Sequence, residues 1–89
     1  MEAALERYFC AEVKARGGWA IKLNPLGLRG IPDRLVIMPG GRIIFVELKT
    51  DRGRLSKIQK AVHRKLLGLG CTVEVLYGRI QVDAWLELY

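Results

Sequence analysis

Residues 30–53, GIPDRLVIMPGGRIIFVELKTDRG, place the tightest limits on what this chain can fold into. Two apolar runs, 35–38 and 43–46, flank a Pro-Gly-Gly turn, which is the pattern of a β-hairpin with largely buried strands. Charged residues nevertheless stand at the strand ends: Asp33 before the first run, then Glu47 and Lys49 after the second. Because a carboxylate on a half-buried strand is costly to desolvate, these side chains need partners.

The register of the hairpin decides whether the two carboxylates share a face. A two-residue loop would set Asp33 opposite Leu48, on the other face from Glu47. A three-residue loop pairs Met38 with Arg42 and sets Asp33 directly opposite Glu47, and a β-bulge would restore the same phase. We predict the three-residue loop or a bulge.

Two carboxylates that lie this close repel each other unless a cation sits between them. Mg²⁺, or Mn²⁺ in its place, is the natural candidate, because it is content with one or two carboxylates, waters and a phosphate. Lys49 lies on the same strand face as Glu47 and can orient a water or stabilise charge that develops on a phosphate. These groups suit metal-assisted phosphodiester hydrolysis. The alternative is turn chemistry at Asp33 and a solvent-facing ion pair between Glu47 and Lys49.

The rest of the chain predicts one α/β domain over residues 1–89. The expected order is α-β-β-β-α-β with a terminal strand and helix, which gives a mixed sheet with helices packed on it. The expected elements are a helix at 2–16, strands at 19–23, 33–38 and 42–49, a helix at 55–69, strands at 71–77 and 80–82, and a last helix from 84.

Three details refine these helices. Leu5, Phe9 and Val13 form one apolar stripe of the first helix, as residues 58, 62, 66 and 69 do in the second. Ser56 and Gln59 have the spacing of a capping box. Asp83 is predicted to cap the last helix.

The charge balance points to a polyanionic partner. The formal net charge is +6 and the isoelectric point is about 9.8, which favours nucleic acid. No uncharged run approaches the roughly 20 residues of a membrane helix, so no membrane partner is expected. Cys10 and Cys71 form no metal-type cluster and are expected to be free thiols in a reducing cytosol. No phosphate-binding loop, zinc spacing or serine nucleophile motif is present.

GIPDR at 30–34 and FVELK at 45–49 resemble the PD-(D/E)xK nuclease superfamily, and more narrowly its VRR-NUC (virus-type replication-repair nuclease) family. The resemblance covers nearly the whole chain, from the leading helix through Gly17-Gly18 and Lys22 to LSKIQ at 55–59. It implies a restriction-endonuclease-like core and Mg²⁺- or Mn²⁺-dependent DNA cleavage without a small-molecule cofactor. For stand-alone phage-type members it implies a homodimer that acts on branched DNA, such as four-way (Holliday) junctions, in the cytoplasm of a phage-bearing or other bacterial cell. The alternatives are a nuclease that nicks or cuts linear DNA and a non-catalytic DNA-binding module of the same fold.

The resemblance also implies residue roles. Asp33 and Glu47 would bind the metal together with the backbone carbonyl of Leu48, and Lys49 would be the catalytic lysine. The family's helical glutamate falls on Glu6.

Several assignments stay open. Glu2 lies on the same side of the helix as Glu6, one turn earlier, and is not excluded. Gln59 would serve either as a catalytic residue beside the lysine or as the helix cap, and His63 is read as a boundary residue rather than a base. Trp19 and Trp85 are interpreted as core or interface anchors. The expected DNA contacts are Lys22, Arg29, Arg52, Arg54 and Lys57.

Overall fold

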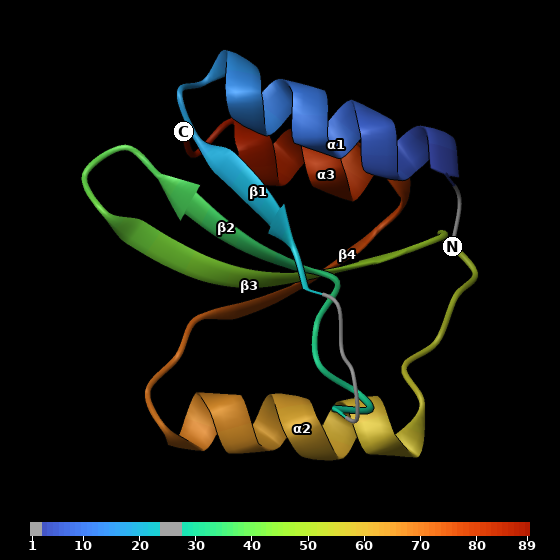
Figure 1. Ribbon diagram of the computed structural model, residues 1–89. Helices are drawn as coiled ribbons and strands as arrows, with labels where there is room; N and C mark the ends of the chain where they lie inside the picture. Colours follow the sequence, from blue (N-terminus) through green and yellow to red (C-terminus); the bar gives the residue numbers. More distant parts are fainter. Residues whose placement is uncertain (1–2, 24–27) are drawn as a thin grey trace.

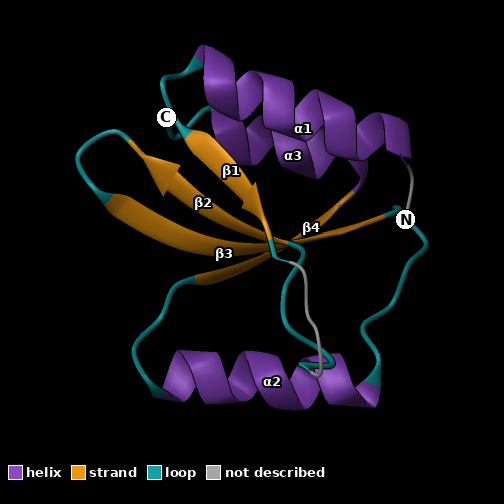
Figure 2. Cartoon of the chain, in the orientation of Figure 1, coloured by secondary structure: helices purple, strands orange, loops and turns teal. Residues whose placement is uncertain are grey.

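A computed structural model describes residues 3–23 and 28–89 of the chain. A four-stranded sheet carries two helices on one face and one helix on the other (Figure 1, Figure 2). The elements are α1 (Ala3–Ala15), β1 (Trp19–Lys22), β2 (Arg34–Met38), β3 (Arg42–Lys49), α2 (Lys57–Gly68), β4 (Val73–Tyr77) and α3 (Gly78–Leu86). This is the mixed α/β architecture that the sequence predicts. No helix in the described ranges has the length and apolar character needed to cross a bilayer.

The sheet has the order β1-β2-β3-β4, with antiparallel pairs up to β3 and a parallel pair between β3 and β4. Met38 pairs with Arg42, which confirms the three-residue hairpin loop. Gly40 and Gly41 have φ angles of 90° and 76°, a conformation that side-chain-bearing residues rarely adopt. The glycines therefore fix the register, and the register fixes which side chains share a face.

The hydrophobic core lies between the sheet and the α1–α3 pair. Leu5, Phe9 and Val13 are buried as predicted, and the Phe9 and Trp85 rings pack with centroids 5.7 Å apart. The alternate strand residues that face these helices complete the core: Val36, Met38, Ile44, Val46, Leu48 and Leu76. The other sheet face is left for polar chemistry and for α2.

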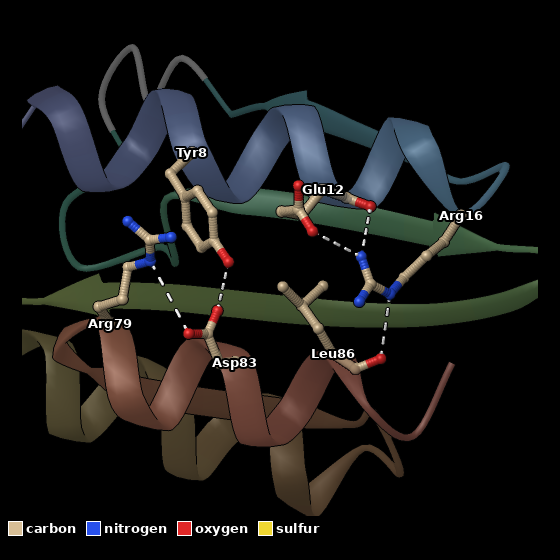
Figure 3. Close-up of polar contacts among 6 residues, drawn as sticks. All are labelled: Tyr8, Glu12, Arg16, Arg79, Asp83 and Leu86. Atoms are coloured by element: carbon tan, nitrogen blue, oxygen red, sulfur yellow. Dashed lines mark hydrogen bonds and ion pairs between the residues drawn. The ribbon is translucent and has the colours of Figure 1, made fainter.

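The expected strand at 80–82 is wrong, because α3 begins at Gly78, directly after β4. Val82, Trp85 and Leu86 are buried at helical spacing. Asp83 is not a cap, since it lies inside α3 and accepts a hydrogen bond from the Tyr8 hydroxyl (Figure 3).

Polar contacts tie α1 to α3 along their length. The Arg79 guanidinium lies 3.5 Å from the centroid of the Tyr8 ring. The Arg16 Nε donates a hydrogen bond to the Leu86 carbonyl at 3.2 Å (Figure 3). These bonds hold the two helices together as one layer over the core.

The predicted apolar stripe of α2 is buried only in part, since Val62 and Leu66 are half-buried. Ile58 and Leu69 are 39% and 73% exposed, whereas His63 is buried. The helix turns Gln59 and His63 toward the sheet, because the Glu47 carboxylate there needs polar partners.

Candidate active site

Asp33 and Glu47 meet at one end of the sheet, on the face that α2 covers. The β2–β3 ladder ends with Arg34 paired to Val46, so the next positions in the register are Asp33 and Glu47. The Leu48 N–H donates a 2.8 Å hydrogen bond to Asp33 Oδ2, which holds the Asp33 carboxylate over β3. The predicted juxtaposition of the two carboxylates is present.

Local structure explains why Asp33 is held so firmly. Pro32, directly before it, is fully buried, and the Asp33 carbonyl accepts a 3.1 Å hydrogen bond from the Leu23 N–H.

The direction of the Leu48 carbonyl follows from strand geometry. The N–H and C=O of one strand residue point to the same side of the strand. The Leu48 carbonyl therefore faces the same side as its N–H, toward Asp33.

Glu47 is the electrostatic centre of the site. Its side chain is only 2% exposed. Burial, then the hydrogen bond and charge of Asp33, raise the pKa of Glu47 to about 8, and the nearby Lys49 opposes this rise. Lys49 Nζ lies 3.9 Å from Glu47 Oε2. A cation placed beside this carboxyl group would therefore favour its ionised form.

Gln59 is both a helix cap and a neighbour of the site. Its backbone N–H donates to Ser56 Oγ at 3.1 Å and its Oε1 accepts from the Ser56 N–H at 2.9 Å, so the capping box is confirmed. Its Nε2 donates to Glu47 Oε2 at 3.3 Å. The cap fixes the amide so that its other end reaches the carboxylate.

His63 lies deeper in the site than the sequence suggests. It is 5% exposed, so reading it as a boundary residue is wrong. Its Nε2 is 3.7 Å from Glu47 Oε1, and burial followed by the charge of Lys49 lowers the pKa of His63. Its spacing of one helical turn from Gln59 is the signal that places both residues over Glu47.

The donor set fits a hard divalent cation. Glu47 Oε1 is buried and has no hydrogen-bond partner among the described residues. Together with Asp33 and the Leu48 carbonyl it offers oxygen ligands alone, which Mg²⁺ and Mn²⁺ prefer. Residues 3–23 and 28–89 contain no group of three His, Cys, Asp or Glu side chains placed to hold a metal. A cation bound here would take its ligands from two carboxylates, the backbone and solvent.

Glu6 lies on the other face of the sheet. Its carboxylate forms an ion pair with Arg34, and Arg34 pairs with Val46, which points into the α1–α3 core. Asp33 and Arg34 are neighbours in the chain, so their side chains alternate between the two faces. Among the described residues Glu6 makes no ion pair or hydrogen bond with the carboxylate pair. Glu2 lies outside the described residues.

The basic residues divide between two places. Arg29 and Arg54 line a hollow of about 390 Å³ together with Lys49 and Gln59. Arg52 lies beside Arg54 in a neighbouring pocket, and Lys57 is exposed at the start of α2. Lys22 instead lines a hollow with Glu6 and Arg34, away from the carboxylate pair.

Comparison with known proteins agrees with this architecture. A mixed sheet whose central hairpin ends in paired carboxylates and a lysine defines the class of PD-(D/E)xK-type nucleases. Residues 23–80 match the VRR-NUC domain, which is more than half of the chain, so the chain belongs to the VRR-NUC family.

Two relatives support this assignment. The chain is 43% identical over 75 residues to "Putative nuclease p44" of Acyrthosiphon pisum secondary endosymbiont phage 1, covering 84% of this chain and 81% of the relative. A solved structure described as a VRR_NUC domain superposes with a TM-score of 0.90 at 35% identity, covering 99% of this chain and 96% of the other. The chain is thus a nuclease-family protein with the fold of that domain.

Proposed function

We propose that this protein is a Mg²⁺- or Mn²⁺-dependent DNA endonuclease that hydrolyses phosphodiester bonds, with selectivity for branched DNA such as four-way junctions. The observation that carries the proposal is the adjacent pair of the half-buried Asp33 and the buried Glu47, with Lys49 Nζ 3.9 Å from the Glu47 carboxylate. Two carboxylates that lie this close together are stabilised by a shared cation.

Asp33, Glu47 and the Leu48 carbonyl would hold the metal. When bound, a divalent ion there neutralises phosphate charge and lowers the pKa of a coordinated water. The Leu48 N–H fixes Asp33, and the Gln59 amide fixes one oxygen of Glu47. Lys49 stabilises the charge that grows on the phosphate oxygens in the transition state.

The remaining assignments are parts of the same proposal. Gln59 acts by orienting Glu47 and the site water. Glu6 can join the site only if it exchanges its Arg34 partner, so we assign it a secondary, water-bridged role. The DNA backbone follows Arg29, Arg52, Arg54 and Lys57, with Lys22 at the far side of the sheet end.

A homodimer is the assembly that suits a branched DNA substrate. Two copies related by a twofold axis present two active sites, which suits a junction with two equivalent strands. Exposed apolar side chains support such an assembly: Trp19 and Ile43 are 67% and 53% exposed. Both cysteines are free, which suits action in the cytoplasm of a bacterium or of a phage-infected cell.

The test is a cleavage assay on linear duplex and four-way junction DNA of the same sequence, with Mg²⁺, Mn²⁺ or EDTA. We expect cutting of the junction with either metal, none in EDTA, and none by Asp33→Asn. Arg64→Ala, an exposed change elsewhere on α2, is the control and should cut like the wild type. Equal cutting of both substrates would favour a nuclease of linear DNA. Binding without any cutting in either metal would favour a non-catalytic module.

A further inference from the structure

A second cavity lies directly beside the carboxylate site. It measures about 390 Å³ and is formed by the segment after β3, the start of α2 and the end of β4. Arg52, Arg54 and Lys60 line it, together with Tyr77 and Asp51. Neither carboxylate of the catalytic pair belongs to its walls. The cavity is therefore a separate feature that needs its own explanation.

The cavity is continuous with the catalytic groove. Lys49 and Tyr77 are register partners on the parallel strands β3 and β4, so their side chains lie on the same face, on strands about 4.8 Å apart. Arg54 lines both this cavity and the groove that contains Lys49 and Gln59. A DNA strand with its scissile phosphate at Lys49 can thus enter the cavity with the adjacent nucleotide.

The cations of the cavity are available to a ligand. Arg52, Arg54 and Lys60 are exposed, and none of them forms an ion pair within residues 3–23 and 28–89. They stand against a single acidic side chain in the wall, Asp51. Three positive charges held around one hollow favour a phosphate group.

Tyr77 and Asp51 indicate that the ligand of this cavity contains more than a phosphate group. The half-buried Tyr77 presents a phenol to the cavity, and aromatic rings bind unpaired bases by stacking. Asp51 weakens a site built for phosphate alone, but it can accept a hydrogen bond from an exocyclic amino group of a base. Phosphate-binding cations, an aromatic ring and an acceptor together match one nucleotide.

The cavity has the size of a small-ligand pocket. Pockets for small ligands span about 300–1,000 Å³, and this cavity lies at the low end of that range. In a duplex the base is stacked and paired, so it cannot reach the Tyr77 ring. An unpaired nucleotide can enter without the free-energy cost of unstacking and unpairing a base.

We propose that this cavity binds one unpaired nucleotide next to the scissile phosphate, with Arg52, Arg54 and Lys60 on its phosphate and Tyr77 stacked on its base. The inference rests on the proposed nuclease function and deepens it. It favours branched DNA that exposes an unpaired nucleotide near the cut over linear duplex, because such DNA fills the cavity directly, whereas a fully paired four-way junction must first open a base pair at its branch point.

The test measures DNA affinity in EDTA, where no cutting occurs. Two probes of one sequence are compared by fluorescence anisotropy: a full duplex, and the duplex with an unpaired 2-aminopurine at a strand branch. Tyr77→Leu keeps the bulk of the residue but removes the π face. It should lower affinity for the branched probe by about 5- to 100-fold, the scale of one lost base–aromatic stack, and leave the duplex nearly unchanged.

Three further variants sharpen the result. Tyr77→Phe keeps the ring and should rescue most of the branched-probe affinity and the quenching of 2-aminopurine. Lys60→Ala should weaken both probes and lower the salt slope by about one. Lys14→Ala, an exposed change on α1, is the matched control and should alter neither probe.

Equal loss on both probes in Tyr77→Leu would overturn the inference, and so would unchanged binding of the branched probe. The outcome is independent of catalysis. If the wild type cuts branched DNA with Mg²⁺ but Tyr77→Leu binds it normally, the cavity inference fails and the nuclease proposal stands. If Tyr77-dependent binding is found without any cutting, the nuclease proposal fails and the cavity inference stands.

Discussion

At the scale of single residues, the chemistry depends on how one buried carboxylate is surrounded. Glu47 meets an amide from Gln59, an ammonium from Lys49 and an imidazole from His63. None of these groups neutralises it at hydrogen-bonding distance, since the Lys49 and His63 nitrogens lie 3.9 Å and 3.7 Å away. We therefore expect the site to favour a further cation.

The first prediction separates Lys49 from the surrounding arginines. Lys49→Ala should lower single-turnover cleavage at saturating DNA by at least ~100-fold, because it removes a charge that acts in the transition state. Its DNA affinity in Ca²⁺ should change little. Arg54→Ala should weaken affinity and lower the salt slope by about one, while its rate recovers at saturation. Normal cutting by Lys49→Ala at saturation would reduce Lys49 to a phosphate contact.

The second prediction concerns pH and folding stability without metal. The fold raises the pKa of Glu47 from its ordinary 4.5 to about 8, so the folded state retains a proton that the unfolded chain loses. Stability from this proton is complete below pH 4.5 and is lost as the pH rises toward 8. In EDTA the unfolding free energy of the wild type should fall over this window relative to Glu47→Gln.

Urea unfolding at a series of pH values checks this expectation, with Glu87→Gln as the control because Glu87 is an exposed acid. Mg²⁺ should remove much of the loss near pH 8, since it binds the ionised carboxylate. Parallel pH profiles for the wild type and Glu47→Gln would contradict the raised pKa.

The sequence was sufficient to place Asp33, Glu47 and Lys49, because side chains on a strand alternate with period two and the turn fixes the phase. It was not sufficient for His63 or for the Glu6–Arg34 pair. The surroundings of His63 depend on how α2 is rotated against the sheet. The Arg34 partner depends on which side chain of α1 reaches β2. Those are tertiary quantities that no local pattern encodes.

At the scale of elements, the same limit explains the error at the C-terminus. Ile80 and Val82 resemble a strand locally, yet α3 starts without a loop after β4. The Gln81 Oε1 accepts a hydrogen bond from the Tyr77 N–H, which satisfies a backbone donor at the helix start. The helical spacing of Val82, Trp85 and Leu86 was the stronger signal, since each is buried.

The third prediction concerns the contact between α2 and the loop before β2. Gly30 has a φ of 84°, and a β-carbon there would lie 2.7 Å from Cγ2 and 2.8 Å from the carbonyl oxygen of Ile58. Gly40 has a φ of 90° with open space around it. Both Ala variants carry the backbone penalty of about 1–2 kcal/mol. Gly30→Ala should lose about 1–3 kcal/mol more, because the clash is with backbone.

Thermal and urea unfolding of the two variants give the difference directly. Gly30→Ala should also cut DNA more slowly at saturation, since the loop that carries Asp33 is pushed away from Gln59. Gly40→Ala should cut normally. Equal stabilities would show that the loop can move away from α2 at little cost.

At the scale of the whole molecule, the far end of the sheet needs a partner. Trp19 pairs with Ile37 and Ile37 with Ile43, so the three side chains form one row across β1, β2 and β3 on the α2 face. Trp19 and Ile43 are mostly exposed, because α2 contacts the sheet chiefly at β4. An apolar row of this kind is costly in water and is typical of a surface that a second copy covers.

The fourth prediction tests this assembly. Sedimentation equilibrium of the wild type should give twice the 10.1 kDa mass of the chain, and Ile43→Lys should give the mass of one chain, because a buried lysine at a twofold contact would meet its own copy. Ile80→Lys is the matched control, since Ile80 is 85% exposed on α3, outside the row. The row lies at the hairpin end, away from Glu47, so monomeric Ile43→Lys should keep its active site.

That variant should then nick single strands of a junction but lose the paired cuts that two linked sites make. A wild type that sediments as one chain at tens of micromolar would refute the dimer. A dimer that survives Ile43→Lys unchanged would place the interface on another surface. In either case the catalytic assignments, which rest on the opposite end of the sheet, would be unaffected.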